Sequence, residues 1–103
     1  MKRVLIITKI SGQSEKFISE LPGYLTSISA QFLVDFAFYP EFETKIDKQE
    51  WSVIGLSPEV FIHEEEIMLK LKTKGLSHKT RNIRAMHFGL RLYAQIFPAL
   101  LSE

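Results

Sequence analysis

The residues best suited to chemistry in this sequence are a lysine, two serines and a glycine that follow an apolar segment. Lys9, Ser11, Gly12 and Ser14 come directly after the apolar run 4–7. A strand that runs through a small-residue loop into a helix leaves backbone amides free to bind an anion. The lysine and the serines add an ammonium and two hydroxyls as donors. The sequence therefore predicts an anion-binding loop made of Lys9, Ile10, Ser11, Gly12, Gln13 and Ser14.

A plain strand-to-helix connection in a protein core would have the same local sequence, so both interpretations stay open. In α/β sheets, ligands bind beyond the carboxyl ends of the strands. Two later loops follow predicted strands in the same way, and they begin at Ser57 and His87. We therefore expect a shared cleft lined by Ser57, Pro58, Glu59, His87 and Gly89. A packing or capping role for His87 is the alternative.

Several classes of site are absent from the sequence. The chain has no cysteine, which excludes disulfides, thiolate metal sites and a cysteine nucleophile. Its three histidines have no zinc-site spacing. Neither a Walker motif nor a dinucleotide-binding fingerprint is present. We expect no catalytic residue, no metal and no cofactor.

Length and charge limit the remaining possibilities. The chain has 103 residues and a net charge of +1, which favours a single domain spanning 1–103. Nucleic-acid binding is not expected, because the net charge is close to zero. Membrane insertion is not expected, because no apolar run is long enough to span a bilayer. We expect a cytoplasmic protein. Basic residues nevertheless dominate from Lys70 to Arg91, a pattern that fits either an anionic partner or a solvated helix edge.

Apolar spacing predicts strands that alternate with helices. We expect strands at 4–7, 31–39 and 51–56, and an edge strand at 79–83. Ser14 is the predicted cap of a first helix that breaks near Glu20, because Pro22 follows. A second helix runs from Glu64 to a cap at Gly75, and a third covers 90–101. Residues 41–50 form a polar connector, and His87 follows near a strand end.

This alternation predicts an α/β fold, a small three-layer sandwich whose four-stranded sheet is mostly parallel. The order of its motifs resembles the IIB component, lactose/cellobiose type, of the phosphoenolpyruvate-dependent sugar phosphotransferase system. That family has a Cys-x-x-Gly-x-Ser-x-Ser loop after its first strand, and 9–16 here is similar except that Lys9 stands at the cysteine position. The segments 57–60 and 82–89 resemble its later turn and its aromatic-glycine pair. The resemblance implies a flavodoxin-like, IIB-like fold with IIA and IIC components as partners.

The replaced cysteine changes what the resemblance implies about function. In the family, the cysteine accepts phosphate from IIA and passes it to sugar, and a lysine cannot carry phosphate as a thiolate does. Glu15 and Lys16 also replace small residues of the family loop. The expected function is a degenerate or regulatory IIB-like domain that binds a partner or phosphate in sugar uptake. The alternative is a flavodoxin-like protein that binds a flavin phosphate, since 11–16 is similar to the flavodoxin phosphate loop.

Overall fold

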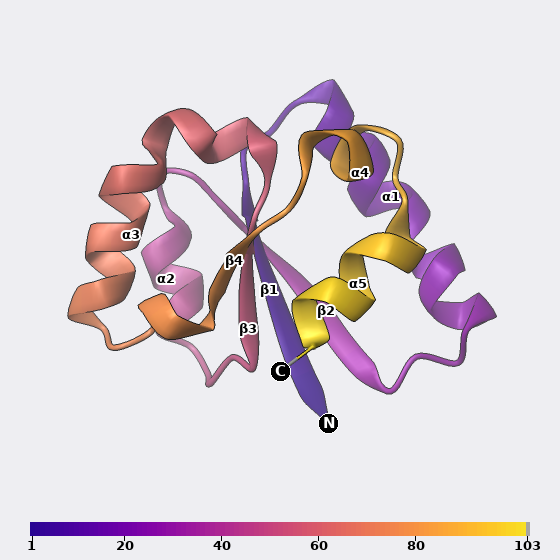
Figure 1. The fold of residues 1–103 in the computed structure, drawn as a ribbon, viewed down its shortest axis with the longest axis horizontal. Coiled ribbons are helices and arrows are strands. Elements are labelled where there is room, and N and C mark those ends of the chain that lie inside the picture. Colours follow the sequence, from indigo (N-terminus) through magenta and orange to yellow (C-terminus); the bar gives the residue numbers. More distant parts are fainter. Residues whose placement is uncertain (103) are drawn as a thin grey trace.

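The computed structural model describes residues 1–102 and confirms the predicted α/β class. Figure 1 shows a central sheet with helices on both sides. In chain order the elements are β1 (Lys2–Thr8), α1 (Gly12–Ser27), β2 (Phe32–Phe38), α2 (Phe42–Ile46), β3 (Val53–Leu56), η1 (Pro58–His63), α3 (Glu64–Thr73), η2 (Ser77–Lys79), β4 (Thr80–Asn82), α4 (Ala85–Gly89) and α5 (Tyr93–Leu101), where η denotes a 3-10 helix.

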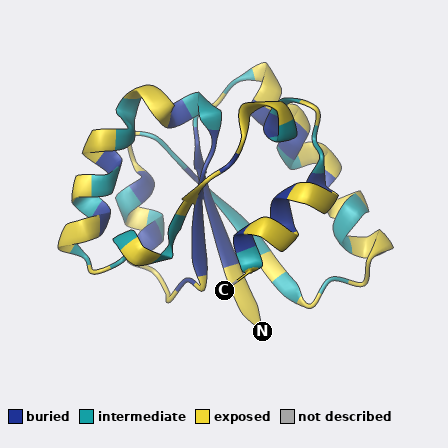
Figure 2. Ribbon diagram, in the orientation of Figure 1, coloured by how far each residue is buried: buried dark blue, intermediate teal, exposed yellow. Residues whose placement is uncertain are grey.

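The sheet is four-stranded, with the order β2-β1-β3-β4, and every pairing in it is parallel. β1 lies between β2 and β3, so that Leu5 is paired with Asp35 on one side and Ile54 on the other. Residues 4–7 are fully buried, as Figure 2 shows for the centre of the sheet. An apolar run without alternation is what a strand covered on both faces requires.

Two apolar cores fill the spaces on either side of the sheet. Val4 and Ile6 pack with side chains of α1, α4 and α5, among them Phe17 and Phe88. Leu5 and Ile7 pack with side chains of α2 and α3 on the opposite face. Successive residues of β1 thus face opposite layers, which gives the three-layer sandwich.

The first helix begins earlier and ends later than the sequence predicted. Ser11, not Ser14, is the N-cap, and α1 continues through Pro22 to Ser27. Pro22 is exposed, whereas Leu21 before it is buried and Leu25 after it packs on the same core. Burial of this apolar face outweighs the loss of one backbone hydrogen bond, so the predicted break near Glu20 is wrong.

Two short helices were not predicted. The polar connector 41–50 contains α2, whose Phe42 and Ile46 are buried. The segment around His87, expected near a strand end, is the helix α4 with Phe88 buried. Each helix has five residues, too few for an apolar period to appear in the sequence. Among residues 1–102, no helix has the length and apolar character needed to cross a membrane.

Candidate functional site

The predicted anion loop lies where the strand order reverses. β1 is followed in the chain by β2 on one side, whereas β3 pairs with its other side. The segments that follow β1, β3 and β4 all leave the same edge of the parallel sheet, at the top of Figure 1. This edge, which we call the carboxyl edge, is the ordinary ligand-binding position in open α/β sheets.

The two serines of the loop form a capping box at the start of α1. The Ser14 amide donates to Ser11 Oγ at 3.1 Å, and the Ser11 amide donates to Ser14 Oγ at 2.9 Å. Ser14 Oγ also lies 2.6 Å from the Lys9 carbonyl oxygen, to which it donates. Ser14 is almost fully buried, at 1% exposure. Its hydroxyl therefore has a structural role, and its amide is already used.

A carboxylate from the next loop reaches into this structure. Ser11 Oγ donates to Glu59 Oε1 over 2.7 Å. The Glu59 amide in turn donates to Ser57 Oγ at 3.2 Å, and Ser57 Oγ donates to Thr8 Oγ1 at 2.8 Å. Ser57 and Thr8 are fully buried. These bonds join the ends of β1 and β3, so the structure brings the first two predicted loops together.

Glu59 takes the position that suits an anion at a helix start. A carboxylate near the first turn of a helix is stabilised by the helix dipole and by hydroxyl or amide donors. Here the chain supplies that carboxylate itself, 48 residues after Ser11. An incoming phosphate would meet a like charge. The carboxylate of Glu59 thus lies where the sequence predicted that an external anion would bind.

Lys9 is directed toward an aromatic pair. Its Nζ atom lies 5.8 Å from the centroid of the Tyr39 ring. The Tyr39 ring also stacks on His63, with centroids 4.0 Å apart and planes 11° from parallel, and on Phe42, with centroids 6.2 Å apart. The Tyr39 hydroxyl donates to Glu66 Oε1 at 2.7 Å, and this hydrogen bond raises the pKa of Tyr39.

Tyr39 and His63 were not among the predicted site residues. Tyr39 directly follows β2, so it leaves the sheet at the carboxyl edge like the predicted loops. Its position after a strand was therefore a usable signal. His63 was expected only at a helix start, where the structure does place it, as the residue before α3.

The third predicted loop divides between two environments. A Cβ atom on Gly89 would lie 2.7 Å from Gln13 Nε2, so Gly89 allows the Gln13 side chain to pack against its backbone. His87 instead lines a cavity of about 420 Å³ with Arg84, Gln95 and other residues of β4 and α5. Gly89 thus joins the anion loop, and His87 belongs to a separate groove.

Exposed apolar side chains lie in three of the segments that leave the sheet at the carboxyl edge. Ile10 is 74% exposed, Ile62 in η1 is 84% exposed and Met86 in α4 is 64% exposed. All three belong to segments that follow strands at the carboxyl edge. Large exposed apolar residues gathered at one edge are typical of protein-binding surfaces.

Comparison with known proteins supports the fold. No protein-family model matches the chain, and no curated protein does. Among solved structures, the chain is similar to the lactose-specific IIB component domain of the phosphoenolpyruvate:carbohydrate phosphotransferase system from Streptococcus pneumoniae, with a TM-score of 0.63 and 14% identity. The alignment covers 93% of this chain and 97% of that domain. The chain therefore has a IIB-like, flavodoxin-like α/β fold.

Proposed function

We propose that this chain is a cysteine-less IIB-like domain of a sugar phosphotransferase system, which binds a protein partner without carrying phosphate. The observation that carries this proposal is the hydrogen bond between Ser11 Oγ and Glu59 Oε1, at 2.7 Å. It places a carboxylate in the loop that the resemblance to IIB components assigns to phosphate. A domain with this loop keeps the fold of a phosphate-carrying IIB domain, but its carboxylate repels phosphate.

The local chemistry supports the same conclusion. Phosphate transfer needs a nucleophile with an available lone pair and a base to activate it. Lys9 stands at the expected cysteine position, and its ammonium is directed toward the Tyr39 ring. The Ser14 hydroxyl is buried and donates to a carbonyl. Neither of these two side chains is arranged as a phosphate acceptor.

Partner binding is supported by the apolar side chains at the carboxyl edge. Ile10, Ile62 and Met86 are exposed apolar side chains in segments that leave this edge. The structural neighbour is named as lactose-specific, so the proposed partners are IIA or IIC components of lactose or cellobiose type. This role implies that residues 1–103 act as one domain in the cytoplasm, where IIB components meet IIA.

The direct test mixes the purified chain with a phosphorylated IIA protein of lactose type. We expect a complex with a dissociation constant in the micromolar range, measured by calorimetry, and no transfer of labelled phosphate to the chain. Replacing Ile62 with serine should weaken the complex about tenfold, because one buried aliphatic side chain contributes roughly 1.5–3 kcal/mol. Leu69→Ser is the matched control, because Leu69 is 64% exposed on α3.

Three outcomes would contradict the proposal. Stable labelling at Ser11, His87 or any other residue would show that the chain carries phosphate. Failure to bind IIA or IIC would show that the edge serves another purpose. Equal weakening by Ile62→Ser and Leu69→Ser would place the interface elsewhere on the molecule.

A further inference from the structure

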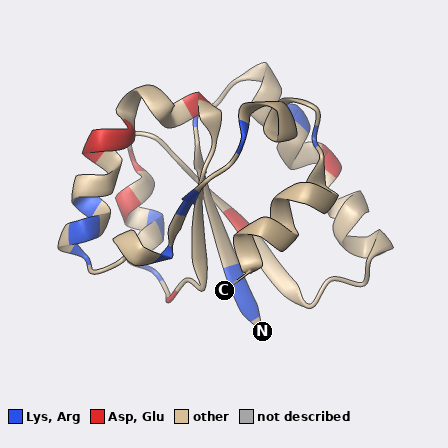
Figure 3. Cartoon of the chain, in the orientation of Figure 1, with Lys and Arg blue, Asp and Glu red and all other residues tan. Residues whose placement is uncertain are grey.

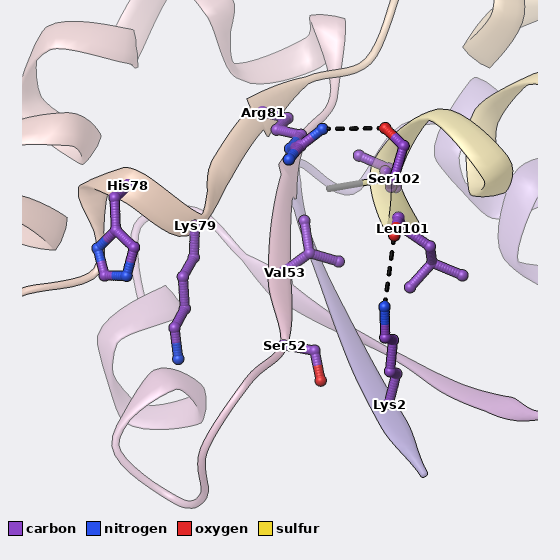
Figure 4. A pocket seen from close by; sticks show the side chains of 9 residues that line it. Lys2, Ser52, Val53, His78, Lys79, Arg81, Leu101 and Ser102 are labelled. Carbon is purple, nitrogen blue, oxygen red and sulfur yellow. Dashed lines mark hydrogen bonds between the residues drawn. The ribbon is translucent and has the colours of Figure 1, made fainter.

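A basic cavity lies at the edge of the sheet opposite the anion loop. It has a volume of about 270 Å³ and opens between the amino ends of the strands and the last turn of α5. Figure 4 shows Val53 and Ser52 between the basic side chains of β1 and those of the η2–β4 segment. Its lining consists of Lys2, Ser52, Val53, His78, Lys79, Arg81, Leu100, Leu101 and Ser102.

Three cations from separate segments line this cavity. Lys2 is in β1, Lys79 is in η2 and Arg81 is in β4. Figure 3 shows basic residues at the start of β1 and also in β4. The fold, rather than one charged run, therefore collects these three side chains. The uneven charge along the sequence indicated a basic region, and β4 carries part of it to this edge.

The donors of these cations are only partly used. Lys2 Nζ donates to the Leu101 carbonyl at 3.4 Å, and Lys79 Nζ donates to the Trp51 carbonyl at 3.1 Å. Arg81 Nη1 donates to the Ala99 carbonyl and to Ser102 Oγ, each at 3.3 Å. An ammonium has three donors and a guanidinium has five. The contacts within the described residues 1–102 therefore leave several donors on each side chain for a ligand.

The described part of the chain supplies no negative charge to the cavity. No Asp or Glu lines it, and the ion pairs within residues 1–102 use Lys45, Lys70, Lys74 and Arg91 instead. Within residues 1–102, every acceptor bound by Lys2, Lys79 and Arg81 is neutral. The three cations repel one another. An anion bound between them would attract each of them and offset this repulsion.

A structural role at the end of α5 accounts for only part of the cluster. Lys2 and Arg81 donate to carbonyls of the last turn, where cations are favourable. Lys79 donates instead to Trp51, in the segment before β3, and His78 beside it lines the same cavity. Helix capping therefore leaves the charge of Lys79 unexplained.

We propose that this cavity binds a small oxyanion, either free phosphate or the phosphate group of a small ester. Phosphate oxygens match several ammonium and guanidinium donors that converge from different directions. Ser52 supplies a hydroxyl nearby, and Val53 and Leu100 supply an apolar wall for an organic group. This site is at the opposite edge from the anion loop and does not depend on the proposed partner binding.

The test follows backbone amide signals of the full chain by NMR while inorganic phosphate is added at constant ionic strength. We expect saturable shifts at Lys2, Lys79 and Arg81, with sodium chloride as the control titrant. Glycerol 3-phosphate is titrated in parallel. Tighter binding of the ester assigns the site to an organic phosphate, and equal binding assigns it to the free ion.

Lys79→Gln keeps a donor for the Trp51 carbonyl while it removes the charge. It should weaken phosphate binding about fivefold, the effect of one unit charge at ~4 Å in water. Lys2→Gln removes a second positive charge from the cavity and should also weaken phosphate binding. Lys72→Gln is the matched control, since Lys72 is exposed on α3 and does not line the cavity. Unchanged affinity in both cavity variants, or shifts no larger than those with chloride, would overturn the proposal.

Discussion

Replacing Glu59 with glutamine tests whether the carboxylate occupies the anion loop. The change keeps an oxygen that accepts from Ser11 Oγ and removes only the negative charge. We expect two linked effects. The protein should become less stable without phosphate, and its loop should acquire affinity for phosphate.

The stability loss follows from two contacts. A hydrogen bond to a charged group contributes about 1.5–3 kcal/mol, against about 1 kcal/mol for a neutral one. A carboxylate near a helix start adds about 0.3–1 kcal/mol through the dipole. Because glutamine keeps the neutral bond, the expected loss is about 1 kcal/mol. For a domain of this size, that corresponds to a fall of about 4–5 °C in the melting temperature.

The gain in phosphate affinity follows from removal of a like charge. Two unit charges ~4 Å apart interact by about 1 kcal/mol in water and about 4 kcal/mol at an effective dielectric constant of 20. Glu59 is half-buried, so the relief lies between these limits. Even the lower limit increases phosphate affinity about fivefold.

The assay combines urea unfolding with an NMR titration. Urea midpoints give the stability change, and the amide signals of Gly12 and Gln13 report phosphate at the loop. The Lys79→Gln background reduces interference from the basic cavity at the opposite edge. The reasoning is refuted if the unchanged loop binds phosphate as tightly as Glu59→Gln, or if the variant is as stable as the parent.

Three further predictions concern the core and the loop. Pro22→Ala should raise the free energy of unfolding, measured by urea titration, by about 1–2 kcal/mol, because Pro22 is an exposed residue inside α1. A decrease would show that the proline stabilises the helix. Burial raises the pKa of Tyr93 to about 12, and its hydroxyl donates to the Phe17 carbonyl at 2.7 Å; Tyr93→Phe should therefore cost about 1 kcal/mol at pH 7. Between pH 10 and about 12 the unfolded tyrosine loses its proton before the native one, so the parent should lose stability with pH relative to Tyr93→Phe, as parallel unfolding curves would reveal, and a constant difference would contradict this. Flavin mononucleotide should leave the amide signals of Gly12 and Gln13 unchanged, because the Glu59 carboxylate opposes its phosphate, whereas saturable shifts there would favour the flavodoxin-like alternative.

The elements that the sequence predicted best are those whose signals are local and redundant. Residues 4–7 are apolar without alternation, and they form the central buried strand. The helix α3 has glutamates in its first turn and lysines in its last. Gly75 follows it with a φ of +72°, and its amide donates to the Lys72 carbonyl. Each of these signals lies within a few residues of the structure that it specifies.

The errors arose where tertiary packing decides the outcome. Pro22 predicts a break on local grounds, yet Phe17, Leu21 and Leu25 bury one continuous face against the sheet. The segment after β4 was expected near a strand end, with His87 just before Gly89. That residue, Phe88, stacks on Phe17 with ring centroids 4.5 Å apart, a contact between α4 and α1. No spacing within either segment records such a contact.

The candidate site shows the same limit from the side of function. Ser11, Gly12 and Ser14 predict an anion site from adjacent residues, and the local geometry of a helix start with a capping box is present. The group that occupies it comes from Glu59, far along the chain, through a connection fixed by the buried bond between Ser57 and Thr8. The parallel pairing of β1 and β3 brings Glu59 to the loop. The sheet, and not the loop sequence, therefore determines that a carboxylate of the same chain lies there. A loop motif of this kind therefore predicts a position suited to an anion. Whether a side chain of the same protein occupies that position depends on the loop that follows the neighbouring strand.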